Sequence, residues 1–199
     1  MELATSLVAT VLLQLLPGLA LLTLLWPNSP LTLSERVALA LGIGVALPPL
    51  LLEAARLLGF PWAAAATIAY ILLSILVLSV HGIRTVRLKR QWLLPIGPDI
   101  LLGVLFVGGL GVRLYMVRDL PAGLWGDSYH HTVITQLLVD HQGLFTSWMP
   151  YVPLVTMTYH FGFHANAAFL HWASTLPTVE AVIFTGQTLN ALTIPLAYL

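Results

Sequence analysis

A cluster of residues with metal-binding and proton-transferring side chains lies between two apolar stretches of this chain. The segment RDLPAGLWGDSYHHTVITQLLVDHQG, residues 118–143, contains three Asp, one Arg and three His. Farther along, His160, His164 and His171 recur at spacings of four and seven, which place them on one face of a helix. Six of the seven His therefore lie between residues 130 and 171. Carboxylates and imidazoles of this kind could hold a metal ion, bind a phosphate or transfer a proton.

The metal interpretation has a defined set of candidate ligands. Carboxylate oxygen and imidazole nitrogen bind several divalent ions, and His at i and i+4 is a known ligand spacing. The HxxxH pattern lacks the Glu of the zinc-protease motif HExxH, which argues against that class of hydrolase. The structural alternative is that His164, Asn166 and His171 only form hydrogen bonds between helices. The candidate ligands are Asp127, His130 (or His131 in its place), His160 and His164.

The overall composition is that of a membrane protein. Of the 199 residues, 58% are hydrophobic and 8% are charged, and the mean hydropathy is +0.91. Soluble domains carry about 25% charged residues. Eight Lys and Arg balance eight Asp and Glu, so no excess of positive charge favours nucleic acid as a partner. The chain has no Cys, which excludes disulfides and thiolate metal sites.

Six apolar stretches are long enough to cross a bilayer, which takes about 20 helical residues. The sequence therefore predicts an all-α, polytopic bundle of about six transmembrane helices. The expected spans cover residues 6–26, 37–58, 62–80, 98–117, 159–176 and 179–199.

The distribution of basic residues predicts how the bundle is oriented. The loop HGIRTVRLKRQW, residues 81–92, holds four of the eight Lys and Arg, and Arg36 lies in another loop on the same face. Basic loops of membrane proteins stay in the cytoplasm. We then expect three segments on the external side of the membrane: the N-terminus, the turn near Pro61 and residues 118–158.

The external segment is expected to contain a short amphipathic helix lying in the membrane interface. Asp127 and Ser128 would stand at its start, where a carboxylate meets the positive end of the helix dipole and Ser128 could cap free amides. The apolar face of this helix would consist of Val133, Ile134, Leu137 and Leu138.

The chain divides into two expected regions. Residues 1–97 would form a three-helix membrane region that ends in the basic cytoplasmic loop, and residues 98–199 would begin a second module containing the external loop. The first apolar run is too long for a signal peptide and has no basic start, so we expect it to remain as a membrane anchor. The last apolar run ends without a polar anchor, and we expect these residues to be the N-terminal part of a longer protein.

This layout resembles the GT-C superfamily of polytopic membrane glycosyltransferases. WGDSYHH, residues 125–131, resembles the acidic motif in the first external loop of that family. The stretch around YHFGFH, residues 159–164, is similar to one in uncharacterised bacterial members. The N-terminal region, from about residue 15 to residue 52, looks like the extra helices that such proteins carry ahead of the catalytic module.

The resemblance implies an enzyme of the bacterial plasma (inner) membrane, and thus of the cell envelope. It would transfer a sugar from a polyprenyl-phosphate donor to a glycan, lipid or protein acceptor on the external face of the bilayer. Asp127 occupies the matching motif position and would be the general base. Some members of the family need a divalent metal ion and others do not. The donor phosphate or other parts of the substrate would be bound by Arg113, Arg118, His131, His160 and His164.

Two other classes of protein remain open at the level of the sequence. A transporter subunit would also place ionisable groups in a polar cavity, but it would carry them deeper in several helices and would pair broken helices. A non-catalytic membrane scaffold would need no acidic external loop. The sequence after residue 199 would discriminate between these classes.

Overall fold

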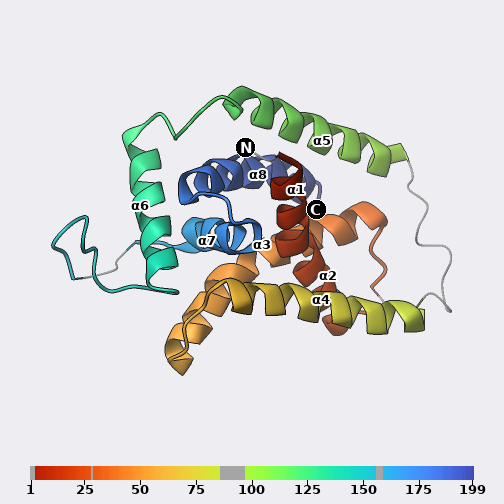
Figure 1. The fold of residues 1–199 in the computed structure, drawn as a ribbon. Coiled ribbons are helices and arrows are strands. Elements are labelled where there is room, and N and C mark those ends of the chain that lie inside the picture. Colours follow the sequence, from red (N-terminus) through yellow and green to blue (C-terminus); the bar gives the residue numbers. More distant parts are fainter. Residues whose placement is uncertain (1–2, 28, 86–96, 156–158) are drawn as a thin grey trace.

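The computed structural model describes residues 3–27, 29–85, 97–155 and 159–199, and within them every regular element is a helix and no strand is present. α5 and α4 lie on opposite sides of the molecule, with the N-terminal helices, α7 and α8 between them, and α6 stands at one end (Figure 1). The elements are α1 (Leu3–Thr10), η1 (Val11–Leu15), α2 (Leu16–Leu25), α3 (Leu33–Leu58), α4 (Ala64–Thr85), α5 (Gly97–Val117), α6 (Gly126–Asp140), α7 (Gly162–Ser174) and α8 (Thr178–Ala197).

Among the described residues, four helices are long and apolar enough to cross a membrane: Thr5–Leu25, Leu33–Leu58, Ala64–His81 and Gly97–Val117. α7 and α8 pass this test only as a pair, and their axes bend by 119° at the break between them. The six predicted spans are therefore not confirmed. The reason is the length of α7, whose 13 residues extend about 20 Å, whereas the hydrocarbon core is about 30 Å thick.

The N-terminal span packs against α3 at very close range. A π-helical turn, Val11–Leu15, comes shortly before Pro17, which has no N–H to continue the helical ladder. Beyond it, an ideal Cβ on Gly18 would lie 1.8 Å from the carbonyl oxygen of Ala40. Any side chain at this glycine would therefore push the two helices apart.

The prolines inside α3 explain a contact made by α7. Pro49 has no N–H to donate to the carbonyl oxygen of Val45, which a regular helix would satisfy. The side-chain Nδ2 of Asn166 donates to that oxygen instead, at 3.0 Å. Asn166 thus forms a hydrogen bond between helices, as the structural alternative proposed for it.

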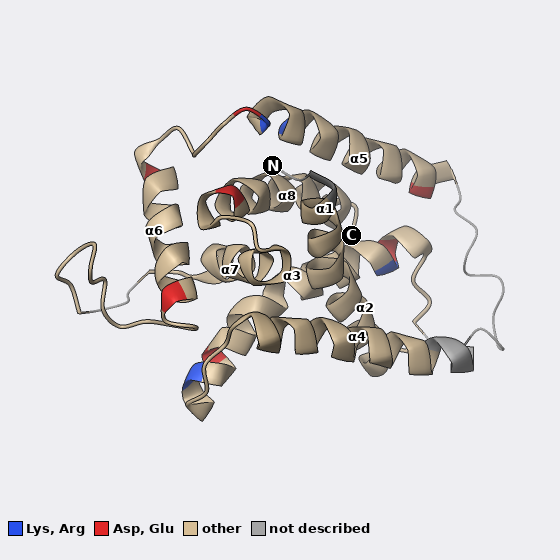
Figure 2. Ribbon diagram, in the orientation of Figure 1, with Lys and Arg blue, Asp and Glu red and all other residues tan. Residues whose placement is uncertain are grey.

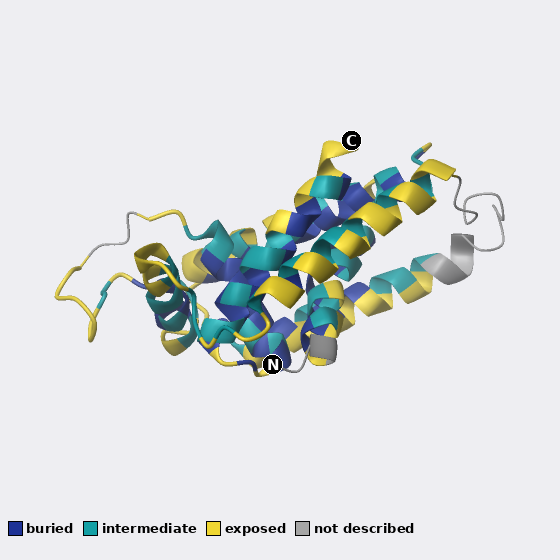
Figure 3. Ribbon diagram, turned by 90° about the horizontal axis from the view of Figure 1, so that it is seen from above, coloured by how far each residue is buried: buried dark blue, intermediate teal, exposed yellow. Residues whose placement is uncertain are grey.

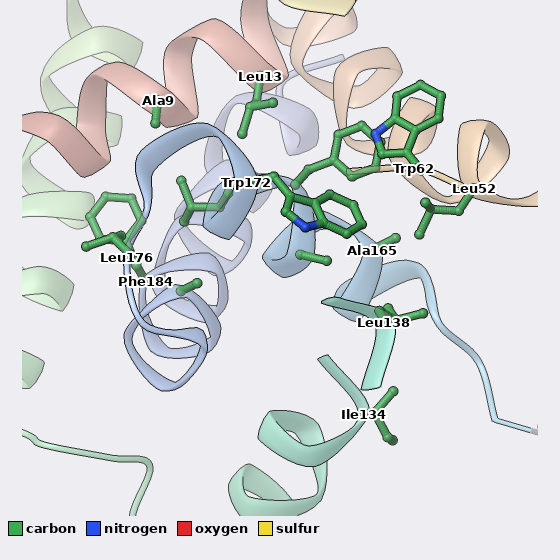
Figure 4. Close-up of a cluster of buried hydrophobic side chains, with 14 of the residues drawn as sticks. Ala9, Leu13, Leu52, Trp62, Ile134, Leu138, Ala165, Trp172, Leu176 and Phe184 are labelled. Carbon is green, nitrogen blue, oxygen red and sulfur yellow. The ribbon is translucent and has the colours of Figure 1, made fainter. Parts of the chain in front are cut away.

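The apolar core lies where the N-terminal helices, α3, α6, α7 and α8 meet. Figure 4 shows side chains from all of these elements in one cluster, including Leu13, Leu52, Ile134 and Trp172. α4 and α5 turn large apolar side chains outward. In α5, only 6% of the residues in its most apolar stretch are buried (Figure 3). The charged residues lie near helix ends and in the connections (Figure 2). An outward apolar surface between charged ends is what a bilayer requires.

Two hydrogen bonds show which helix ends lie together. The backbone N–H of Trp62, in the turn before α4, donates to the carbonyl of Gln142, just after α6, at 2.6 Å. At the other end, the N–H of Ser34 in α3 donates to Asp99 in α5, at 3.1 Å. The segments predicted to share the external side therefore lie next to each other. The basic residues Arg87, Lys89 and Arg90, and the side chain of Arg84, fall outside the described part of the structure.

Candidate functional site

α6 carries the acidic motif and is held by its apolar face. Ile134, Leu137 and Leu138 are at most 1% exposed, and the helix packs against α7 and α8. Gln136 adds a polar link, because its Oε1 accepts a hydrogen bond from Thr178 of α8 at 2.5 Å. The predicted helix is thus present, but protein rather than lipid covers its apolar face. Its predicted position in the membrane interface is not confirmed.

Asp127 lies in the first turn of α6 without capping it. The helix begins at Gly126, with Trp125 as the N-cap, and no side chain caps its start. The predicted cap by Asp127 or Ser128 is therefore wrong, because both residues lie within the first turn and not at the N-cap. Asp127 is exposed and forms no hydrogen bond or ion pair with any described residue. Its carboxylate, at the positive end of the helix dipole, is therefore open to solvent.

His131 and His164 form a hydrogen-bonded pair between α6 and α7. Nδ1 of His131 lies 2.9 Å from Nε2 of His164. His164 is fully buried, and its Nδ1 forms no hydrogen bond with a described residue. The ring of His131 also contacts Phe163 and Tyr159, with centroids 5.1 and 6.5 Å away. The structure therefore joins two of the three histidines that the sequence proposed for substrate binding.

A groove of about 380 Å³ opens beside this pair, between α5, α6, α7 and α8. Most of its wall is apolar, and its polar side chains are Ser128, His131 and Gln187. Asp127 precedes Ser128 and lies one helical turn before His131, on the same face of α6. The lining residues are Val117, Leu120, Gly123, Leu124, Trp125, Ser128, His131, Phe163, Val182, Ile183, Gly186 and Gln187.

The two candidate arginines differ in their surroundings. The guanidinium of Arg118 donates to the carbonyl of Tyr115 at 2.7 Å, lies 3.1 Å from the carboxylate of Asp119 and stacks over the Tyr115 ring. Arg113 is half-buried and has no hydrogen bond or ion pair with a described residue. Val117, one turn after Arg113, lines the groove. Arg113 is therefore the arginine that remains available to a bound anion.

The candidate metal ligands do not come together. In the described residues, no group of three or more His, Asp or Glu is placed to hold a metal ion. Nε2 of His164 is occupied by His131, whereas Asp127, His130 and His160 are exposed, and the last stacks on Tyr159. These residues do not fit a divalent metal site. His171, in turn, contacts the carbonyl of Leu176 in the connection just after α7. This contact is structural, but it is local and does not join two helices as the structural alternative proposed.

Sequence reasoning missed the part of the groove that α8 supplies. The polar stretch TGQT, residues 185–188, interrupts an apolar helix and was the available signal, since Gly186 and Gln187 both line the groove. Gly123 was missed as well. An ideal Cβ on it would lie 2.2 Å from the Cβ of Ser128, so glycine is needed where the loop meets α6.

No protein-family model, no curated protein and no solved structure matches this chain. The resemblance to GT-C glycosyltransferases rests on the sequence motifs alone. The function is therefore argued from the groove and the residues around it.

Proposed function

We propose that this chain is part of a bacterial inner-membrane glycosyltransferase of the GT-C type, which uses a polyprenyl-phosphate sugar donor on the external face. The observation that carries the proposal is the groove between α5 and α8. Its wall is mostly apolar, and two of its polar positions, Ser128 and His131, follow Asp127 within the first turns of α6. An isoprenoid phosphate has the same division, with an apolar chain and an anionic head.

The proposed chemistry assigns the general base to Asp127. The acceptor hydroxyl loses its proton as its oxygen attacks the anomeric carbon, and the bond from that carbon to the phosphate oxygen breaks. Asp127 suits the proton acceptor because it is exposed, unpaired and one turn from the groove-lining His131. No metal ion is assigned a step, since the described side chains do not assemble a site for one.

The leaving phosphate would be stabilised by Arg113 and His131. A guanidinium offers two parallel donors to a phosphate, and an imidazole N–H offers one. Arg113 lies one turn before the groove residue Val117, and His131 is in the groove wall. Arg118 and His160 are secondary candidates, because the first is engaged by Asp119 and Tyr115 and the second lies against Tyr159.

The external location of the site follows from the proposed topology. The N-terminus is outside and the basic loop is cytoplasmic. The acidic segment lies on the same, external side of the membrane as the turn before α4. The hydrogen bond from Trp62 to Gln142 supports this sharing. A count of about six spans would require α7 and α8 to cross separately, and the 119° bend between them also fits one broken span.

The groove is tested by narrowing it at Gly186. A Cβ there would just touch Phe163, at 3.9 Å, so the side chain of Gly186→Leu would extend into the groove space. Gly103→Leu is the matched control, since Gly103 is an exposed glycine of α5 with nothing within 4 Å. In the full-length protein, supplied with lipid extract as donor and acceptor, Gly186→Leu should lose at least about 90% of transfer. Equal transfer by both variants would show that the groove holds no substrate.

A transporter subunit is the second candidate, and the bent pair of α7 and α8 favours it. Broken helices line substrate sites in many transporters, because their ends bring backbone dipoles to the middle of the membrane. The break here comes at Thr175, whose φ is +59°. Movement of a polyprenyl-phosphate lipid across the membrane of liposomes that contain the protein, without sugar transfer, would favour this alternative.

A further inference from the structure

The buried histidine of α7 holds the histidine that faces the groove. Nε2 of His164 is 2.9 Å from Nδ1 of His131, and this is the only hydrogen bond of the His164 ring within the described residues. The backbone carbonyl of His160, one turn earlier, also interacts with this ring, although Nδ1 has no partner that meets hydrogen-bond geometry. His164 is 0% exposed, so it cannot itself meet a ligand.

The contact fixes which nitrogen of His131 is available. Nδ1 is used by His164, and the ring also contacts Phe163 and Tyr159. Nε2 is neither enclosed nor hydrogen-bonded to any described residue. Because His131 is part of the groove wall, Nε2 is the atom that can reach a bound molecule.

We propose that His164 is a positioning residue, which holds His131 so that its Nε2–H donates to an anionic phosphate oxygen of an isoprenoid lipid in the groove. This assignment deepens the proposed function and rests on it for the identity of the lipid. It gives the two histidines different tasks, although the sequence offered both as substrate-binding residues. The ligand class is a lipid phosphate, because the groove provides an apolar wall as well as a donor.

The proton positions in the pair are linked. A neutral imidazole has one N–H, so one ring must donate to the other between His131 and His164. An anionic oxygen at Nε2 of His131 needs a donor there, so in a neutral pair His164 must donate its Nε2–H to Nδ1 of His131. This arrangement leaves a lone pair, and not an N–H, on the buried Nδ1 of His164.

Two variants of His164 separate positioning from packing. The side-chain amide of His164→Gln places an N–H donor near the original Nε2, whereas His164→Leu keeps an apolar bulk and loses the donor. Nitrogen NMR of the histidine side chains in the full-length, detergent-solubilised protein reports which ring nitrogen of His131 carries the proton. We expect the Nε2–H form in the wild type with farnesyl phosphate and in His164→Gln, and a mixture of both forms in His164→Leu.

Binding of farnesyl phosphate gives the second readout. His164→Leu should weaken it about tenfold, the scale of one hydrogen bond to a charged group, and His164→Gln should restore most of the loss. Inorganic phosphate should bind much more weakly, and farnesol should bind all variants alike because it lacks the anion. His131→Leu should match His164→Leu, and it replaces that variant if His164→Leu does not fold.

The outcomes distinguish this inference from the proposed function. An unchanged His131 spectrum and unchanged farnesyl phosphate affinity in folded His164→Leu would overturn the positioning role. If the wild type binds no farnesyl phosphate, the proposed function and the ligand assignment both fail. If the wild type binds farnesyl phosphate but His164→Gln binds it no better than His164→Leu, the groove still holds the lipid. The proposed hydrogen bond from His164 to His131 is then wrong.

Discussion

The two arginines near the C-terminal end of α5 show how local contacts decide which side chain is available to bind an anion. Arg118 is held by Asp119 and by the carbonyl and ring of Tyr115. Arg113 has no such partner among the described residues and lies one turn before a groove residue. A free, half-buried guanidinium beside an apolar groove is suited to a phosphate.

Replacement of Arg113 should therefore affect the donor. Arg113→Ala is expected to raise KM for the lipid donor, or lower kcat, about tenfold, because a hydrogen-bonded charge pair is lost. Arg113→Lys should restore activity only partly, since an ammonium lacks the two parallel donors. Steady-state kinetics on the full-length protein measures both. Arg118→Ala is the control and should change the kinetics less. If both Arg113 variants have unchanged kinetics, the Arg113 side chain only anchors the helix to lipid headgroups.

At the level of elements, the contact between α3 and α7 depends on one side chain. Asn166 provides the donor that Pro49 removes from the helix, and it is 5% exposed. Asn166→Leu should destabilise the protein by about 1–3 kcal/mol, the cost of leaving the Val45 carbonyl buried and unpaired. Chemical unfolding in mild detergent measures the difference in stability. Asn190→Leu changes an exposed Asn of α8 and should have little effect; equal stability of the two variants would mean that the Val45 carbonyl finds another donor.

Helix boundaries could largely be predicted from hydropathy, because apolar length is a local property. The predicted span 98–117 nearly coincides with α5, and the span 37–58 ends with α3. α3 begins earlier, at Leu33, because Thr32 and Glu35 form a capping box. The predicted span 159–176 corresponds to α7, but the helix covers only Gly162–Ser174, because Thr175 ends it in a left-handed conformation.

The candidate site could be predicted only where it is local. Asp127 and His131 share one short motif, and the spacing of the later histidines placed His164 on a helix. The groove depends on Val117 and Gly186, which are far apart in sequence and meet only because α5 packs on α8. The bond between His131 and His164 likewise joins two helices, and no periodicity within one helix predicts it.

For the whole molecule, the first expectation concerns sidedness. The turn before α4 and the end of α6 are hydrogen-bonded to each other, and α3 and α5 begin at the opposite end. A reporter fused after Arg90 should therefore read cytoplasmic, and one fused after Gly143 should read external, because basic loops stay inside. The reverse pattern would put the groove and Asp127 on the wrong side for an external donor.

The central claim is that the carboxylate of Asp127 accepts the proton of the acceptor hydroxyl. Asp127→Asn keeps the size of the side chain, and its fold should survive because Asp127 contacts no described residue through a hydrogen bond or ion pair. An amide cannot take the proton, so turnover should fall about 100-fold or more. Asp140→Asn, at the other end of α6, is the matched control, since Asn can still accept the hydrogen bond from Gln136.

The measurement is sugar transfer from a polyprenyl-phosphate donor by the full-length protein, with donor binding recorded in the same preparations. The account predicts that Asp127→Asn binds the donor like the wild type and loses transfer, while Asp140→Asn retains both. Full transfer by a well-inserted Asp127→Asn protein would contradict it, because the carboxylate would then have no part in the reaction.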